Sequence, residues 1–250
     1  MKAIAIIPAR LASTRLPRKV LREIAGKTML AHVYEAARAS HLVEDVIVAT
    51  DSEEVMSLCR RNKWKARMTS PEHRSGTDRV REVATALDDD FDVYINIQGD
   101  EPLLHPEHID ALLKPMARTT VAVSTVMTPC SERDIANPNA VKVVTDLSGR
   151  ALYFSRSTIP FDRDQTKGFP YMKHLGLYAY RKDALNRFCE LPESALERSE
   201  RLEQLRFLEN GIDVYVAETP HDTVGVDTEE DLKRVEGILN ERKNSARSTD

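Results

Sequence analysis

The sequence of 250 residues lacks several features that would assign it to a particular class of protein. It has three cysteines, far apart and without the spacing of metal ligands, which favours free thiols in a reducing cytoplasm. Its net charge of −4 creates no general attraction for nucleic acid or for an anionic membrane. Its apolar runs are far shorter than a membrane span, and the first of them is too short for a signal-peptide core. We therefore expect a cytoplasmic globular protein that neither binds nucleic acid nor inserts into a membrane.

Two glycine-rich phosphate-binding fingerprints are also missing. The chain has no G-x-x-x-x-G-K-[ST] motif of a P-loop. It also has no G-x-G-x-x-G after its first expected strand, which argues against an NAD-dependent dehydrogenase. Any phosphate site in this protein must therefore be built largely from side chains.

The N-terminal segment offers such side chains. Residues 3–7 form an apolar run that is typical of a buried strand, and Pro8 ends it. The loop that follows contains four cations, Arg10, Arg15, Arg18 and Lys19. Because α/β sheets bind ligands at the carboxyl ends of parallel strands, this loop predicts a site for a polyanion such as a nucleoside triphosphate. The alternative is a solvated basic loop, which is weakened by the buried strand directly before it.

The next segments alternate between strand and helix patterns. Apolar periodicity predicts a helix at residues 28–40, a buried strand at 45–50 and a capped helix at 51–61, the rhythm of a parallel sheet. Residues 137–144 and 151–155 are joined by a short polar connection and predict an antiparallel pair. We therefore expect an α/β protein with a mixed, mainly parallel sheet flanked by helices and a smaller antiparallel insertion.

Two further segments suggest binding chemistry. Asp100 follows a strand expected at residues 93–97, and a carboxylate beside a triphosphate needs a cation between them, for which Mg²⁺ is suited. The alternative is an aspartate that only ends the strand. Residues 75–79 can begin a helix whose free N–H groups bind an anion or a base, or can form a plain helix cap, and both interpretations stay open.

Several blocks of the sequence together resemble the acid-sugar cytidylyltransferases. The first comprises Pro8-Ala-Arg10, Ser13, Arg15-Leu-Pro17 and Lys19. The others follow in the same order at residues 73–79, 96–102, 137–142, 153–160, 174–178, 202–206 and 225–228. The resemblance covers roughly residues 2–239 and is strongest for the branch that acts on 3-deoxy-D-manno-octulosonate (Kdo). Two departures adjoin the expected nucleotide site: Asp78 stands where Glu is frequent, and Arg18 where Gly is frequent.

The resemblance implies a fold, a reaction and partners. The fold is a Rossmann-like, GT-A-like nucleotidyltransferase domain over residues 1–240, with a sugar-binding and dimerisation part near 130–210 and a polar tail at 241–250. The reaction transfers CMP from CTP to the anomeric hydroxyl of Kdo, with Mg²⁺ as cofactor, for lipopolysaccharide synthesis in the cytoplasm. A homodimer is implied. The alternatives are a cytidylyltransferase for 8-amino-Kdo or sialic acid, and a nucleotide-binding module without catalysis.

The resemblance also implies roles for individual residues. Catalysis falls to Arg10, Lys19 and Asp100. The expected magnesium ligands are Asp100 and Asp227, the second after a strand-like segment at residues 223–226. The expected nucleotide contacts are Ala9, Arg10, Ser13, Arg15, Lys19, Ser75, Gly76, Thr77, Asp78, Arg79 and Gln98. The expected sugar contacts are Gln98, Arg156, Arg163, His174, Tyr178, Glu203 and Gln204.

Overall fold

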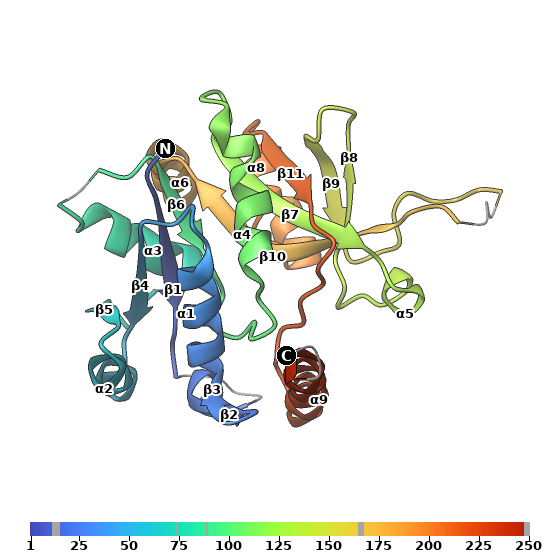
Figure 1. Ribbon diagram of the computed structural model, residues 1–250. Coiled ribbons are helices and arrows are strands. Elements are labelled where there is room, and N and C mark those ends of the chain that lie inside the picture. Colours follow the sequence, from blue (N-terminus) through green and yellow to red (C-terminus); the bar gives the residue numbers. More distant parts are fainter. Residues whose placement is uncertain (12–15, 74, 89, 165–167, 248–250) are drawn as a thin grey trace. The chain divides into compact units, whose positions relative to one another are not determined.

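The computed structural model describes residues 1–11, 16–73, 75–88, 90–164 and 168–247, and forms two compact units, each assembled from separate stretches of chain (Figure 1). The terminal unit contains Lys2–Phe91, Asn96–Pro106 and Thr223–Asp250. The central unit contains Met1, Asp92–Ile95 and Glu107–Asp222. We describe each unit by itself.

The terminal unit contains the expected parallel strands. Strand β4 pairs in parallel with β1 on one side and with β5 on the other, and residues 3–7 of β1 are fully buried. Helices α1 and α2 connect these strands and are capped by Thr28 and Ser52, whose side-chain oxygens accept backbone N–H groups of the first turn. The strand and helix predictions for residues 28–61 are therefore confirmed. The elements of this unit are β1 (Ala3–Pro8), η1 (Lys19–Leu21), β2 (Glu23–Ile24), β3 (Lys27–Thr28), α1 (Met29–Ala39), β4 (Asp45–Thr50), α2 (Glu53–Asn62), β5 (Lys65–Met68), α3 (Gly76–Thr85) and α9 (Glu229–Arg247).

The C-terminal helix α9 covers a small separate core of the terminal unit. This core comprises Leu16, Ile24, Met29, Leu103, Val226, Leu232 and Val235. The expected strand at residues 223–226 is absent from the described structure, so that prediction was wrong. Its apolar pattern instead reflects packing, because Val226 is buried in this core and its N–H donates to the carbonyl oxygen of Asp100 at 3.0 Å.

The central unit is built mainly on antiparallel pairing. Strand β10 pairs with β7 and β8 in the antiparallel sense, and β11 pairs with β7 in parallel. The expected hairpin is confirmed as the antiparallel pair of β8 and β9, with Gly149 at a φ of 82° in its turn. The elements are β6 (Val93–Asn96), α4 (Pro106–Leu113), η2 (Pro115–Ala117), β7 (Val123–Pro129), α5 (Glu132–Ile135), β8 (Lys142–Thr145), β9 (Ala151–Ser155), β10 (Met172–Tyr180), α6 (Lys182–Glu190), α7 (Ala195–Glu200), α8 (Leu205–Glu209) and β11 (Val214–Glu218).

The expected fold class is thus observed: a mixed sheet flanked by helices, with a smaller antiparallel part. Helices α1 and α2 in the terminal unit and α4 and α6 in the central unit accompany the strands (Figure 1). Within the described ranges, no helix combines the length and apolar character needed to cross a membrane.

Candidate active site

A close approach of two backbones forms the starting point of the candidate site in the terminal unit. Gly99 follows β6 and lies against the end of β1, where an added Cβ would come within 2.9 Å of the carbonyl oxygen of Pro8. Only glycine fits there without movement of the backbone. This close approach holds the next residue, Asp100, beside the end of β1.

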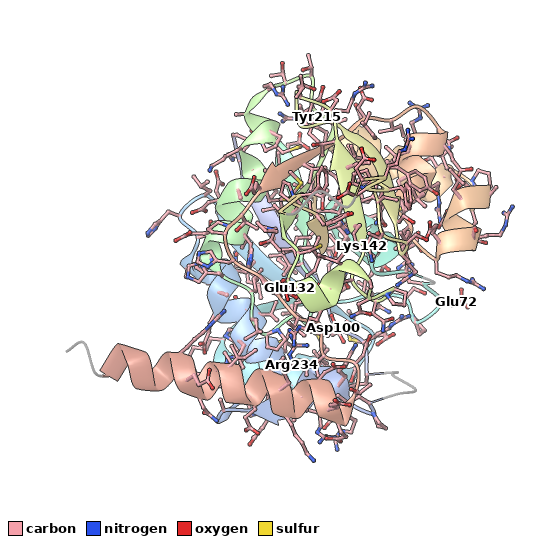
Figure 2. All side chains as sticks on the ribbon, turned by 90° about the vertical axis from the view of Figure 1, so that its right-hand side faces the viewer. Glu72, Asp100, Glu132, Lys142, Tyr215 and Arg234 are labelled. Carbon is pink, nitrogen blue, oxygen red and sulfur yellow. The ribbon has the colours of Figure 1, made fainter. Side chains whose placement is uncertain are left out.

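Lys19, Asp100 and Asp227 form a charged cluster at this place. The Lys19 Nζ donates to Asp227 Oδ1 at 2.9 Å and also forms a short hydrogen bond to Asp100 Oδ2. Asp100 is labelled in Figure 2, near the side of the terminal unit on which α9 lies. The two aspartates, far apart in sequence, thus share one cationic partner. We call these three residues the edge cluster.

The electrostatics of the edge cluster favour a bound cation. Burial disfavours the charged form of Lys19, but the charge of Asp100 and the hydrogen bonds that Lys19 donates to both aspartates outweigh it, so the pKa of Lys19 is raised. The side chains of Asp100 and Asp227 remain 29% and 44% exposed. Two accessible carboxylates that face one cation match the preference of Mg²⁺ for one or two carboxylates with its remaining positions open to phosphate and water. The donor set therefore fits the magnesium that the sequence predicts.

The segment predicted for the nucleotide begins helix α3 and lies beside the same strand end. A Cβ added at Gly76 would lie 3.5 Å from Pro8 Cγ and 3.6 Å from both amide atoms of Gln98. Ser75 and Asp78 form a capping box in which each side chain accepts the other's backbone N–H. Of the two open interpretations, the cap is thus observed, while the neighbourhood of Gln98 remains compatible with a ligand at the helix start.

Arg79, also predicted to contact the nucleotide, lies inside the terminal unit. Its side chain is 2% exposed, forms an ion pair with Asp51 at 2.8 Å and donates a short hydrogen bond to Thr69 Oγ1. Asp51 follows β4 and Thr69 follows β5, so the guanidinium connects α3 to the ends of two strands. Arg79 thus joins the start of α3 to the ends of β4 and β5.

The loop after β1 is described only in part. The N–H of Ala9 donates to Ala49 O at 2.8 Å, and the Arg10 side chain is exposed. Ser13 and Arg15 lie outside the described residues. Arg18 adopts a left-handed φ of 57° and pairs with Glu54 on α2.

Four residues predicted to contact the sugar belong to the central unit. The rings of His174 and Tyr178, both on β10, lie 5.5 Å apart. Burial lowers the pKa of His174 to about 3, so the imidazole is neutral near pH 7. Burial, followed by the charges of Tyr180 and Glu203, raises the pKa of Tyr178, which places the Glu203 carboxylate nearby. Gln204 is 6% exposed, and its Nε2 has no hydrogen-bond partner among the described residues.

The tautomer of His174 follows from its neighbour. Thr125 Oγ1 donates to Leu177 O at 2.7 Å and lies 2.9 Å from His174 Nε2. A hydroxyl that has given its proton to a carbonyl can only accept, so His174 carries its proton on Nε2. The Nδ1 of a neutral imidazole is then a hydrogen-bond acceptor.

The remaining sugar predictions are distributed differently. All three guanidinium nitrogens of Arg156 donate to backbone carbonyls, the closest being Nε to Glu200 O at 2.7 Å. Arg163 is 90% exposed and lies 4.0 Å from Asp164. Gln98 belongs to the terminal unit. The structure therefore brings His174, Tyr178 and Glu203 together, with Gln204 next to Glu203 in the chain, and leaves Arg163 in solvent.

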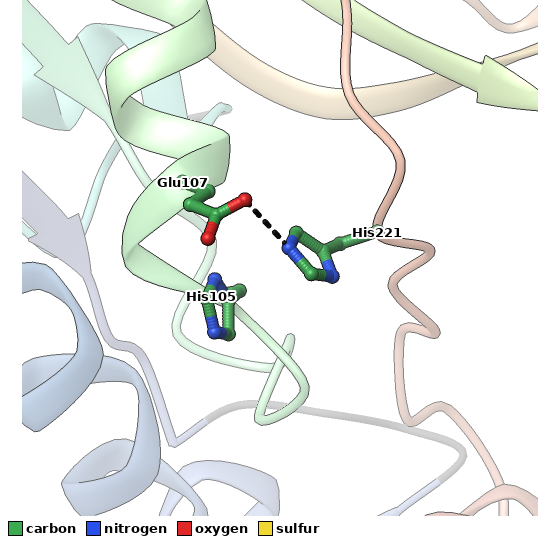
Figure 3. Close-up of side chains that lie close together, drawn as sticks. All are labelled: His105, Glu107 and His221. Atoms are coloured by element: carbon green, nitrogen blue, oxygen red, sulfur yellow. Dashed lines mark hydrogen bonds and ion pairs between the residues drawn. The ribbon is translucent and has the colours of Figure 1, made fainter.

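Two polar features of the central unit escaped the sequence reasoning. Lys142 on β8 is fully buried; in the sequence it is a lysine between the valines of an apolar strand, at the end of one block that carries the family resemblance. Figure 3 shows the other feature, a hydrogen bond of 2.8 Å between His221 Nε2 and Glu107 Oε2. His108 beside it donates to His221 O at 2.9 Å, which fixes the backbone before residue 223.

Comparison with known proteins adds to this geometry. The model of a family described as cytidylyltransferase matches residues 4–216. The chain is 66% identical over 242 residues to 3-deoxy-manno-octulosonate cytidylyltransferase of Koribacter versatilis, covering 97% of this chain and 92% of that protein. It is 61% identical to the protein of the same name from Acidobacterium capsulatum, covering 97% and 98%. The solved structure of CMP:2-keto-3-deoxy-manno-octonic acid synthetase complexed with CTP is similar at a TM-score of 0.92 and 42% identity, covering 97% of this chain and 100% of that one.

Proposed function

This chain belongs to the cytidylyltransferase family, and from that premise we propose that it transfers CMP from CTP to the anomeric hydroxyl of Kdo. The names of the two relatives and the CTP in the similar solved structure support this choice of substrates. The observation that carries the proposal is the edge cluster, in which two carboxylates from distant segments face one cation beside the end of β1. A pure nucleotide-binding module has no need of two carboxylates next to phosphates.

The chemistry is an in-line displacement at phosphorus. The anomeric hydroxyl of the sugar loses its proton to solvent as its oxygen forms a bond to the α-phosphorus, the bond from that phosphorus to the bridging oxygen breaks, and pyrophosphate leaves with the electron pair. Asp100 and Asp227 would hold Mg²⁺, which neutralises phosphate charge and lowers the pKa of the attacking hydroxyl. Lys19 and Arg10 would bind the phosphates and stabilise the charge that develops on pyrophosphate.

Each unit supplies groups suited to one substrate. In the terminal unit, the start of α3 beside Gln98 supplies polar groups able to read a pyrimidine edge. In the central unit, the neutral His174 and the unpaired amide nitrogen of Gln204 suit sugar hydroxyls. The exposed guanidinium of Arg163 suits the sugar carboxylate. We further propose that the enzyme acts as a homodimer, as its family resemblance implies.

A panel of substrates tests the proposal. Pyrophosphate release is followed with CTP, ATP or GTP, each combined with Kdo, 8-amino-Kdo or sialic acid, in the presence of Mg²⁺. We expect kcat/KM to be highest for CTP with Kdo, and CTP to exceed both purine nucleotides by about 100-fold or more, because buried polar groups left unpaired by the wrong base are costly. Fastest turnover with another sugar would reassign the substrate, and no release with any sugar would favour the binding module.

A further inference from the structure

The buried lysine of the central unit is held in an unusual way. The Lys142 side chain is 0% exposed, and Figure 2 labels it among the packed side chains of this unit. Its Nζ donates to three carbonyl oxygens: Asn137 O at 2.8 Å, Ala140 O at 2.5 Å and Arg156 O at 2.8 Å. An ammonium group has three N–H donors, so all of them are used.

Stability alone gives little reason for a lysine at this position. Removing an ammonium group from water costs several kcal/mol, and an apolar side chain of similar size often serves as well or better. The benefit of Lys142 is geometric instead, because its ammonium group links a turn at residues 137–140 to Arg156, the residue that follows β9.

Arg156, the residue so fixed, is also attached to helix α7. Its N–H donates to Glu200 Oε2 at 3.0 Å, and its Nε donates to Glu200 O at 2.7 Å. Ser155 Oγ donates to the other carboxylate oxygen of Glu200 at 2.6 Å. Lys142, Arg156 and Glu200 thus form a bracket that joins β8, β9 and the end of α7.

The two ends of the bracket lead to the residues proposed to contact the sugar. On one side, Phe154 of β9 contacts the His174 ring edge-on, with centroids 5.0 Å apart. On the other, the chain leaves α7 through Arg201, at a left-handed φ of 54°, and reaches Glu203 and Gln204 within three residues. Displacement of the bracket would therefore move both groups of sugar contacts.

We propose that Lys142 is a positioning residue of the acid-sugar subsite, acting through the backbone of Arg156. The inference rests on the proposed function and extends it to a residue that makes no contact with either substrate.

The test compares two Lys142 variants with a matched control in the same unit. Lys142→Met removes all three donors, Lys142→Gln retains two, and Leu185→Ala opens a cavity at a fully buried position of α6. We expect Lys142→Met to raise the KM for Kdo about tenfold, equivalent to about 1.4 kcal/mol, and to leave the KM for CTP within twofold. Lys142→Gln should raise the KM for Kdo by a smaller factor. Leu185→Ala should lower Tm without changing either KM.

Every outcome decides the matter. The wild-type protein is assayed first, and its failure to release pyrophosphate with Kdo would refute the proposed function before any variant is considered. If the wild type is active, a Lys142→Met variant with the same KM for Kdo as Leu185→Ala overturns the inference. Equal increases in both KM values also overturn it. If neither Lys142 variant folds, the lysine serves the fold and the positioning role is rejected.

Discussion

Two lysines, one in each unit, have contrasting hydrogen-bond partners. Lys19 in the edge cluster bonds two partly exposed carboxylates, whereas Lys142 in the bracket bonds three backbone carbonyls. A side-chain pair in an accessible place can exchange partners when a charged ligand arrives. A buried ammonium group that is bonded to backbone carbonyls cannot do so without disturbing the fold. Substitutions at the edge cluster should therefore reduce turnover with little loss of stability, and substitutions of internally satisfied groups should act through the protein's own structure.

The largest effect is expected at the two aspartates of the edge cluster. Asp100→Asn and Asp227→Asn each keep the shape and remove the charge that a hard cation prefers. We expect each to lose about 10³-fold or more of Mg²⁺-dependent kcat while Tm stays within a few degrees. The double variant should be far from additive, because both carboxylates serve one ion.

The control for this prediction is Asp45→Asn. Asp45 begins β4 and pairs with Lys65 on the surface of the same unit, so its substitution should leave turnover unchanged. Near-normal activity of either edge variant at limiting Mg²⁺ would show that its aspartate is no metal ligand. A large fall in Tm would instead mean that the edge cluster is needed to hold the fold together.

The next effect concerns Lys19→Ala. Loss of one preorganised charge that acts on a transferring phosphate typically costs 10²–10³-fold in rate, and we expect that loss in kcat. Without its ammonium group the two carboxylates repel each other, so Mg²⁺ should also raise the Tm of the variant more than that of the wild type. Thermal unfolding with and without Mg²⁺ measures this.

Lys27→Ala is the matched control, since Lys27 pairs with the exposed Glu35 in the same unit. A Lys19 variant that unfolds readily but keeps its turnover per folded molecule would reverse the assignment.

The contrast between the two lysines also shows what could be predicted from the sequence. Asp100 and Lys19 follow apolar strand patterns, and parallel strands bring their carboxyl ends to one edge, so their proximity could be anticipated. Lys142 could not, because its partners are backbone carbonyls. Every residue carries one, and nothing in the sequence marks which of them a buried lysine will meet.

Arg79 and Arg156, two predicted ligand contacts, show a related limit. Their partners within the protein, Asp51 for Arg79 and the carbonyl oxygen of Glu200 for Arg156, could not be foreseen from the sequence, while their roles toward the nucleotide and the sugar stay predictions. The misread strand at residues 223–226 has a related cause. Val224 and Val226 are both shielded because they pack in the small core that α9 covers. Two apolar residues at alternate positions have the period of a strand, although this segment forms no strand in the described structure.

A smaller effect is expected from His174, the partly buried imidazole of the central unit. The pKa of His174 is lowered to about 3 in the folded protein, against about 6.5 in the unfolded chain. Between these values the unfolded chain binds more protons, so the free energy of unfolding falls as the pH is lowered from about 6.5 towards 3. One such group contributes a slope of up to about 1.4 kcal/mol per pH unit.

Denaturant unfolding between pH 7 and pH 4.5 measures this slope. The side chain of His174→Asn cannot titrate, so this variant should flatten the decline relative to the wild type. Identical slopes for the two proteins would show that His174 becomes protonated without penalty.

The smallest effect is expected at Ser75, because this residue lies near the edge cluster while its hydroxyl is hydrogen-bonded within the protein. Ser75 lies at the edge and is a predicted nucleotide contact, but its Oγ donates to Asp78 Oδ2 at 2.8 Å and accepts the Asp78 N–H at 3.1 Å. Because the hydroxyl is already used within the protein, Ser75→Ala should lower the free energy of unfolding by about 1 kcal/mol and change the KM for CTP less than twofold.

Thr228→Ala is the matched control, because Thr228 forms the same capping box with Asp231 at the start of α9. The two variants should be indistinguishable in both stability and KM. If Ser75→Ala alone raises the KM for CTP, the Ser75 hydroxyl leaves the helix cap and contacts the nucleotide. A full set of hydrogen bonds within the protein would then no longer predict which residues near the edge cluster take no part in nucleotide binding.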